Sequence, residues 1–388
     1  MTKHRLLISI IFLTFIALGL PDALLGSAWN QARLDLNQPI RSIGLVTFTM
    51  YVMTILSTFL GPHLLTRFST KTITLVSVLL TGSALILMSQ VTAFTGLMLL
   101  AVPLGLGAGA IDLSLNHYVA TKLDQAHMAY LHAFYGVGVS TGPFLMGVAL
   151  ALYTWRTGFL LVGGLLLVIA LSIFVSFPLW PKEAPDSLEV PDISVRRVLK
   201  ARGVKLSILI FTWAVHVESF MGIFVATYAF AGLGLDLATS AFATSIFYAG
   251  LTLGRVVSGL FAKKFSSNQM IVAGQSLMIL AALLLFIPSV PTVFSMGLFG
   301  LMGAGSAPTY PGMMSMNTVN FKPTQISRII SLQMVIGYVG FGFMTPLLGS
   351  LLDLFSMALF PVILLVGSLI VWGLTTTFIT RHRPVGNV

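Results

Sequence analysis

The 388-residue chain is 56% hydrophobic and only 8% charged, with a mean hydropathy of +0.97. Soluble globular domains carry about 25% charged residues, so the composition excludes a soluble globule and indicates an all-α polytopic membrane protein in a lipid bilayer. The absence of cysteine excludes disulfides, thiolate metal sites and cysteine nucleophiles. The net charge of +10 does not indicate a nucleic-acid partner, because the basic residues follow the predicted membrane topology.

Twelve apolar segments are each long enough to cross a bilayer, which takes roughly 20 residues of helix. They cover about 6–29, 42–65, 71–90, 93–123, 127–152, 156–180, 205–235, 239–263, 268–289, 291–319, 325–353 and 358–379. A polar, proline-bearing stretch lies between the sixth and seventh segments. We therefore predict an N-terminal six-helix bundle over 1–180, a linker over 181–204, and a C-terminal six-helix bundle over 205–388.

The positions of Lys and Arg predict the orientation of the chain. If the N-terminus is inside, most of these residues fall in inner loops and tails. Only Arg33, Arg41 and Arg156 fall in outer loops, and Arg255 lies inside the eighth segment. Such a bias follows the positive-inside rule, so we expect both termini and the linker to be cytoplasmic.

Short motifs recur in the two predicted bundles. The pattern Asp22-x3-Gly26 returns as Glu218-x3-Gly222, 196 positions later, and Gly107-Ala-Gly109 returns as Gly303-Ala-Gly305 at the same offset. Some secondary transporters are built from parallel repeats of this kind, with the solute site at the midplane between the halves. The sequence thus predicts two pseudo-symmetric bundles.

Three carboxylic acids lie inside predicted spans, where a charge costs about 2.5–3.5 kcal/mol. Asp22 follows Pro21 in the first segment, Asp112 is central in the fourth, and Glu218 is in the seventh. Because burial disfavours a charged carboxylate, we expect Asp22, Asp112 and Glu218 to couple protons to transport. We expect the proton as coupling ion, with no other cofactor and no metal. The alternative for each acid is a structural hydrogen bond.

The fourth segment carries a polar stripe that faces inward. Gly105, Gly109, Asp112 and Asn116 recur at i, i+4, i+7 and i+11, which places them on one face of a helix. The two glycines allow a neighbouring helix to approach closely. We predict that Asp112 and Asn116 bind a small polar solute, with an interhelical polar clasp as the alternative.

Other side chains in the spans are candidates for contact with the solute, although packing against lipid or other helices is the alternative for each. They are Trp29, Tyr51, His132, Trp213, Tyr310, Asn317, Gln333 and Tyr338. In the tenth segment, Pro308 and Pro311 remove backbone donors and predict an irregular helix, which at this depth is tolerated where it lines a cavity. Arg255 cannot lose its proton, so we expect it in a gating salt bridge near the cytoplasmic end.

The layout resembles the major facilitator superfamily, with six plus six helices, a cytoplasmic linker and basic loops after the second and eighth helices. The loop GPHLLTRFSTK resembles the superfamily's loop after helix 2. It keeps Gly61, Arg67 and Lys71, whereas Thr66 replaces the usual acid. The resemblance implies a gating role for Arg67 and Lys71.

Within that superfamily the chain is most similar to the fucose, galactose and glucose:proton symporters. The matching motifs are GLPDALLGSAW, GAGAIDLSLNHYVA, LHAFYGVGVSTGP, HVESFMG and GAGSAPTYP. In that family an acid in helix 1 and an acid in helix 4 serve proton coupling and sugar binding. The resemblance places these roles on Asp22 and Asp112, with a nearby asparagine at Asn116.

The sequence therefore predicts a proton-coupled symporter of a small polar solute, most favourably a sugar, that works by alternating access. We expect a monomer in the bacterial plasma membrane. One alternative is a proton-coupled exporter of drugs or lipids, whose cavity would use the 18 methionines and 28 phenylalanines. A second is a receptor that binds a ligand without moving it. An enzyme is disfavoured, because no Walker loop or HExxH motif is present.

Overall fold

The structure is a computed structural model that describes residues 3–123, 125–181, 194–262, 264–288 and 291–381. All regular secondary structure in these ranges is helical, as the composition predicts. Half of the predicted linker 181–204, residues 182–193, lies outside the described residues. Its end includes a short helix, α8 (Val195–Lys200), on which Arg196, Arg197 and Lys200 are exposed.

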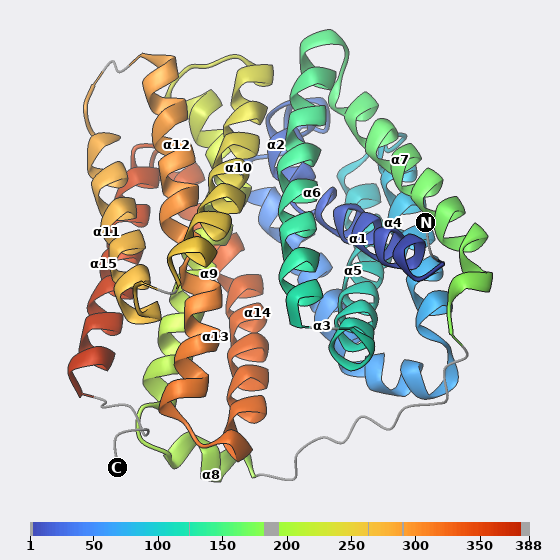
Figure 1. The fold of residues 1–388 in the computed structure, drawn as a ribbon. Coiled ribbons are helices and arrows are strands. Elements are labelled where there is room, and N and C mark those ends of the chain that lie inside the picture. The colour runs from blue at the N-terminus through green and yellow to red at the C-terminus, as the bar shows by residue number, and fades with distance from the viewer. Residues whose placement is uncertain (1–2, 124, 182–193, 263, 289–290, 382–388) are drawn as a thin grey trace. The chain divides into compact units, whose positions relative to one another are not determined.

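The helices follow the predicted apolar segments in order (Figure 1). Besides α8 they are α1 (Lys3–Gly19), α2 (Leu24–Asp35), α3 (Ile43–Arg67), α4 (Thr70–Met88), α5 (Phe94–Lys122), α6 (Gln125–Leu152), α7 (Trp155–Val175), α9 (Val204–Thr227), α10 (Leu237–Phe261), α11 (Ser267–Leu284), α12 (Thr292–Ser306), α13 (Thr309–Asn320), α14 (Pro323–Leu354) and α15 (Leu359–Arg381). Short helical turns are η1 (Ile40–Ser42), η2 (Phe177–Leu179) and η3 (Tyr228–Gly232), of which η3 is a π-helix that extends α9.

Eleven helical stretches among the described residues are long and apolar enough to cross a membrane, compared with the twelve predicted. The difference lies in the predicted segment 291–319, which forms two shorter helices, α12 and α13, separated at Ala307 and Pro308. Proline has no N–H and cannot continue the ladder of helical hydrogen bonds. The irregular backbone predicted here is therefore confirmed.

The first span is interrupted in the same way. The backbone leaves α1 after Gly19, turns through residues 20–23, and re-enters a helix at Leu24. Pro21 lies inside this turn and cannot donate a backbone hydrogen bond. The turn therefore presents Asp22 from non-helical backbone in the middle of a span that runs over Lys3–Asp35.

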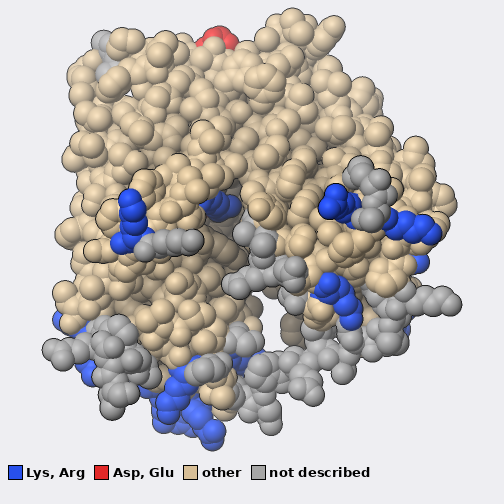
Figure 2. All heavy atoms as spheres, viewed as in Figure 1, with Lys and Arg blue, Asp and Glu red and all other residues tan. Residues whose placement is uncertain are grey.

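Large apolar side chains are exposed along the outer faces of the helices. Val293 is 84% exposed, Phe59 81% and Leu99 72%. Figure 2 shows wide areas of the visible face without charged side chains. A soluble monomer rarely exposes so large an apolar surface, and a lipid environment accounts for it.

The chain forms two compact units, which we call unit 1 and unit 2. Unit 1 is Met1–Leu188 with Ile223–Ser245 and Thr345–Asp353, and unit 2 is Glu189–Gly222 with Ile246–Met344 and Leu354–Val388. The ends of α9, α10 and α14 thus belong to the unit built by the first seven helices. The boundaries predicted from the apolar segments and the polar stretch between them, at residues 180 and 205, stay a prediction.

Polar contacts explain why these late segments belong to unit 1. The Asn30 side chain donates to the Ala226 carbonyl at 2.9 Å, and the Ser245 hydroxyl donates to the Ser140 carbonyl at 2.7 Å. Asp353 accepts the backbone N–H of residue 40 at 3.2 Å and forms an ion pair with Arg41 at 3.8 Å. These contacts hold the end of α14 and both sides of η3 against α2, η1 and α6.

Glycines set the close helix packing in both units. A Cβ at Gly105 of α5 would meet the backbone of α3, and one at Gly107 would meet α4. In the second half, a Cβ at Gly303 of α12 would meet the backbone of α10, and one at Gly305 would meet α11. Glycines of the fourth and tenth spans therefore allow two neighbouring helices to approach closely in each half, and the offset of 196 between the halves stays a prediction.

Candidate functional site

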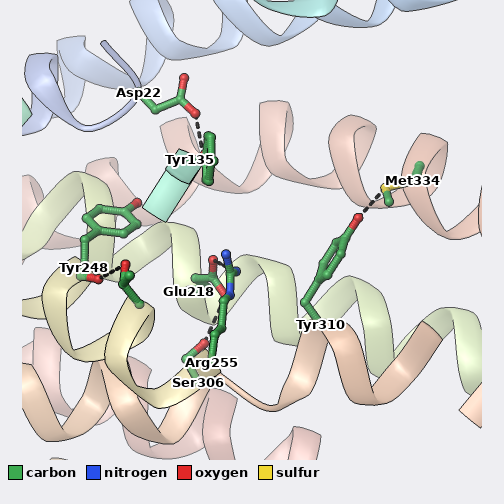
Figure 3. A network of polar contacts seen from close by, with 9 residues as sticks. Asp22, Tyr135, Glu218, Tyr248, Arg255, Ser306, Tyr310 and Met334 are labelled. Carbon is green, nitrogen blue, oxygen red and sulfur yellow. Dashed lines mark hydrogen bonds and ion pairs between the residues drawn. The ribbon is translucent and has the colours of Figure 1, made fainter. Parts of the chain in front are cut away.

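Asp22 is an exposed acid in an otherwise buried turn. Its neighbours Pro21, Ala23 and Leu24 are buried, whereas Asp22 as a whole residue is exposed. The phenol of Tyr135, on α6, donates a hydrogen bond to Asp22 Oδ2 at 2.6 Å (Figure 3). The partner of this acid is thus a neutral donor.

Asp112 and Asn116 lie one turn apart on α5, as predicted. The Asn116 amide donates to Asp112 Oδ1 at 2.8 Å and to the Asp112 carbonyl oxygen at 2.8 Å. Both side chains are partly exposed. The pair therefore combines a carboxylate with an amide on one face, and each retains capacity to bond a solute.

The two acids of unit 1 influence one another. The charge of Asp112 acts on the Asp22 carboxyl, as the third influence after burial and the hydrogen bond from Tyr135. Like charges in an apolar setting favour a state in which one of them is neutral. Unit 1 thus brings together three residues that the sequence singled out, Asp22, Asp112 and Asn116.

Glu218 and Arg255 form an ion pair in unit 2. Arg255 Nη2 donates to Glu218 Oε1 at 3.5 Å, and the Ser306 hydroxyl donates to Glu218 Oε2 at 3.1 Å (Figure 3). Ser306 is the last residue of α12, directly before the break at Ala307 and Pro308. The acid in the seventh span therefore has a permanently charged partner, unlike Asp22 and Asp112.

Three of the residues predicted to contact the solute, Trp29, Asn317 and Gln333, are fully buried and form hydrogen bonds within the protein. Asn317, Gln333 and Ser207 are fully buried and bond to one another, with Asn317 Nδ2 to Gln333 Oε1 at 2.8 Å and Gln333 Nε2 to Ser207 Oγ at 3.0 Å. Trp29 is also fully buried, and its indole N–H donates to the Ile40 carbonyl at 3.0 Å. For Trp29, Asn317 and Gln333 this geometry favours a structural role.

The remaining aromatic and histidine candidates are partly exposed, and their solute contacts stay predictions. They are Tyr51, His132, Trp213, Tyr310 and Tyr338. Ring contacts hold three of them: His132 lies edge-on to a phenylalanine of α1, Trp213 is tilted against a histidine of α9, and Tyr310 packs near a phenylalanine of α9. The Tyr310 hydroxyl also points to the sulfur of Met334 at 4.0 Å.

The two predicted gating residues of the loop after the second span lie in different settings. Arg67 is exposed at the end of α3. Lys71, in the first turn of α4, lies over the ring of Phe177 at 5.2 Å and reaches its carbonyl oxygen at 3.4 Å. The gating role of both stays a prediction, as does the cytoplasmic location expected for the salt bridge of Arg255.

Sequence reasoning missed two partners that the structure supplies. Tyr135 lies 113 positions from Asp22, and Ser306 lies 88 positions from Glu218. Tyr135 lies in the motif LHAFYGVGVSTGP and Ser306 in GAGSAPTYP. A hydrogen bond between side chains of different helices cannot be predicted from the residues next to either one. Within the described residues, no group of three or more His, Asp or Glu side chains is arranged to hold a metal ion.

Comparison with known proteins agrees with this architecture. A family model described as Major Facilitator Superfamily matches residues 8–299 and 207–387. A search of curated proteins finds no match.

Two solved structures illustrate the similarity in fold. A mutant of the nucleoside transporter NupG is 13% identical, with a TM-score of 0.77 over 97% of this chain and 99% of that one. A bacterial homolog of the human lysosomal transporter Spinster, in an inward-facing and occupied conformation, is also 13% identical, with a TM-score of 0.74 over 98% and 95% of the two chains. At this identity the likeness concerns the fold.

The family match spans nearly the whole chain, and the helix order, the apolar spans and the solved neighbours agree with it. The chain therefore belongs to the major facilitator superfamily and is a membrane transporter.

Proposed function

We propose that this transporter couples the uptake of a small polar solute, most favourably a sugar, to the movement of a proton. The observation that carries the proposal is the arrangement of acids in unit 1. Asp22 is exposed at a break in the first span, has a neutral partner, and is acted on by the charge of Asp112.

The proposed cycle follows from the cost of burying charge. When Asp22 and Asp112 are both ionised, their repulsion opposes closure of the site. A proton on Asp22 removes that repulsion, and the solute's hydroxyl groups then bond to Asp112 and Asn116. Fewer uncompensated charges remain to be buried when the site is occluded. The solute leaves on the opposite side, and the proton follows when Asp22 meets water again.

The cellular setting is part of the proposal. The bias of basic residues to one side supports cytoplasmic termini, and we place the chain in a bacterial plasma membrane as a monomer. The favoured solute rests on the resemblance of the helix 1 and helix 4 motifs to those of sugar:proton symporters, and on the hydroxyl-binding chemistry of a carboxylate beside an amide.

The test compares two transport modes of the purified protein in proteoliposomes, with tritiated galactose, glucose and fucose as probes. Counterflow measures exchange without net proton movement, and an imposed pH gradient measures driven accumulation. Asp22→Asn is expected to abolish driven accumulation and retain counterflow. Asp35→Asn is the matched control, because Asp35 lies on the same span but bonds the indole N–H of Trp155 at 2.7 Å; it is expected to retain both modes.

The opposite pattern contradicts the role of Asp22. That pattern is an Asp22→Asn variant that still accumulates solute along the pH gradient but has lost counterflow. A rise in accumulation when the gradient is dissipated contradicts uptake and indicates export.

A further inference from the structure

The Glu218–Arg255 ion pair of unit 2 is held more loosely than a structural pair requires. Its one contact between charged atoms is 3.5 Å long, whereas charge-assisted hydrogen bonds of this type are about 2.7–2.9 Å and arginine often binds carboxylates with two parallel bonds. Arg255 Nε is buried and has no hydrogen-bond partner among the described residues. The guanidinium therefore has unused donors.

The pair is also accessible. The side chains of Glu218 and Arg255 are 24% and 22% exposed, although Val217 beside the acid is buried. Both charged groups thus reach open space from helices that cross the membrane. An ion pair with a purely structural role in a span is most stable when it is fully buried and all its donors and acceptors are bonded. Unsatisfied polar groups raise the free energy there.

The helix break lies at the same place. Ser306, which donates to Glu218, is followed at once by the break. In a continuous helix the carbonyls of Ala304 and Ala307 would accept from residues 308 and 311, but both are proline and have no N–H. The cluster therefore combines a carboxylate, a guanidinium and a hydroxyl directly before a break in the helix.

We propose that Glu218, Arg255 and Ser306 form a solute-binding subsite for a neutral polyhydroxy compound. Neighbouring hydroxyl groups each donate and accept, so one hydroxyl bonds the carboxylate while the next accepts from the guanidinium. An anionic solute gains from Arg255 but is repelled by Glu218, and a cationic solute meets the reverse. The inference rests on the proposed function, because it names the class of solute, but it assigns binding and not proton transfer to these residues.

The test measures binding at equilibrium with no gradient, using the full chain in nanodiscs. The probes are tritiated galactose, glucose, fucose, ribose and uridine as neutral polyols, with gluconate as an anionic and glucosamine as a cationic polyol. Saturable binding of at least one neutral probe is expected for the natural chain, with weaker binding of both charged probes.

Substitutions are expected to change affinity and charge preference together. Glu218→Gln and Arg255→Gln each weaken binding of the neutral probe about tenfold or more, as loss of charged hydrogen bonds predicts. Glu218→Gln gains affinity for gluconate, because Arg255 is left unpaired, and Arg255→Gln gains affinity for glucosamine. A structural role for the pair would not invert the charge preference.

The hydroxyl has its own matched control. Ser306→Ala is expected to weaken binding of the neutral probe about threefold to tenfold, in line with loss of one hydrogen bond. Ser207→Ala removes a buried hydroxyl from the Asn317–Gln333 cluster of the same unit, so it destabilises the fold but leaves affinity unchanged.

Several results overturn the inference. They are no saturable binding of any neutral probe, unchanged affinity in both Gln variants, or affinity losses with no change in charge preference. A natural chain that shows the expected binding but no gradient-driven uptake instead contradicts the proposed proton coupling and leaves the subsite standing.

Discussion

The acids of the two units differ in the charge of their partners. In unit 1, Asp22 accepts from a phenol and Asp112 from an amide, both neutral donors. In unit 2, Glu218 faces the guanidinium of Arg255, which keeps its positive charge. A carboxyl with neutral partners can gain and lose a proton without leaving an unpaired charge beside it, whereas Glu218 cannot be neutralised without stranding Arg255. The comparison supports the two proposals, proton exchange in unit 1 and charge-balanced binding in unit 2.

The largest effect on stability is expected where a charge loses its partner. Glu218→Gln or Arg255→Gln alone should destabilise the fold by about 1–3 kcal/mol, between the cost of breaking an exposed pair and a buried one. The double variant should recover much of that loss, because neither charge remains. Thermal unfolding of the purified protein measures this, and additive losses in the double variant would show that the pair does not interact.

Replacing the neutral partner of Asp22 should change the pH response more than stability. Tyr135→Phe removes a hydrogen bond that favours the ionised carboxylate, so we expect half-maximal driven uptake to move toward higher pH. Counterflow measured at a single pH should persist. A pH profile identical to that of the natural chain would mean that the phenol does not influence the proton site.

The partner of Asp112 should affect the solute and leave the proton response in place. Asn116→Ala removes the amide that bonds the Asp112 carboxylate at 2.8 Å, and we expect the apparent affinity for the transported sugar to fall about tenfold, as loss of a charged hydrogen bond predicts. Initial rates over a range of galactose concentrations measure this. The control is Tyr153→Phe at an exposed residue directly after α6, and it should leave the affinity unchanged.

The smallest effect on stability is expected at Asp236, a solvent-exposed acid whose hydrogen-bond partners are also neutral. Asp236 lies outside the spans, directly before α10, and accepts from the Thr239 hydroxyl at 2.5 Å and the Thr239 N–H at 2.9 Å. These bonds lower the pKa of Asp236 below its ordinary value. Its contribution to stability is therefore present above that ordinary value and is lost as the pH falls.

Asp236→Ala should reduce stability at neutral pH by about 1 kcal/mol, as loss of a helix cap does. The difference from the natural chain should shrink as the solution is acidified. Thermal unfolding at several pH values checks this, and a pH-independent difference would contradict the capping account.

Local signals in the sequence predicted much of the fold. Apolar runs gave the order of the spans, and Pro21, Pro308 and Pro311 marked the two interrupted helices, because a missing N–H acts on its own turn. The contact between Asp112 and Asn116 was predictable from their spacing of four residues on one helix.

Contacts between helices were less accessible to sequence reasoning. Arg255 was expected to have an anionic partner, but its identity as Glu218 depends on how α9 packs on α10. The Tyr135 phenol and the burial of Asn317 and Gln333 likewise depend on tertiary packing. The neighbouring sequence of a polar residue in a span does not show whether its side chain binds the solute or another helix. Both interactions satisfy the same hydrogen-bonding requirement.

The most direct test of proton exchange in unit 1 is solute-induced proton movement without an imposed gradient. Galactose, glucose or fucose is added to proteoliposomes in weakly buffered medium, and the external pH is followed. The natural chain should alkalinise the medium, Glu218→Gln should do so more weakly in proportion to its lower binding, and Asp22→Asn should give no change. Alkalinisation by Asp22→Asn equal to that of the natural chain would contradict the assignment of the proton to Asp22.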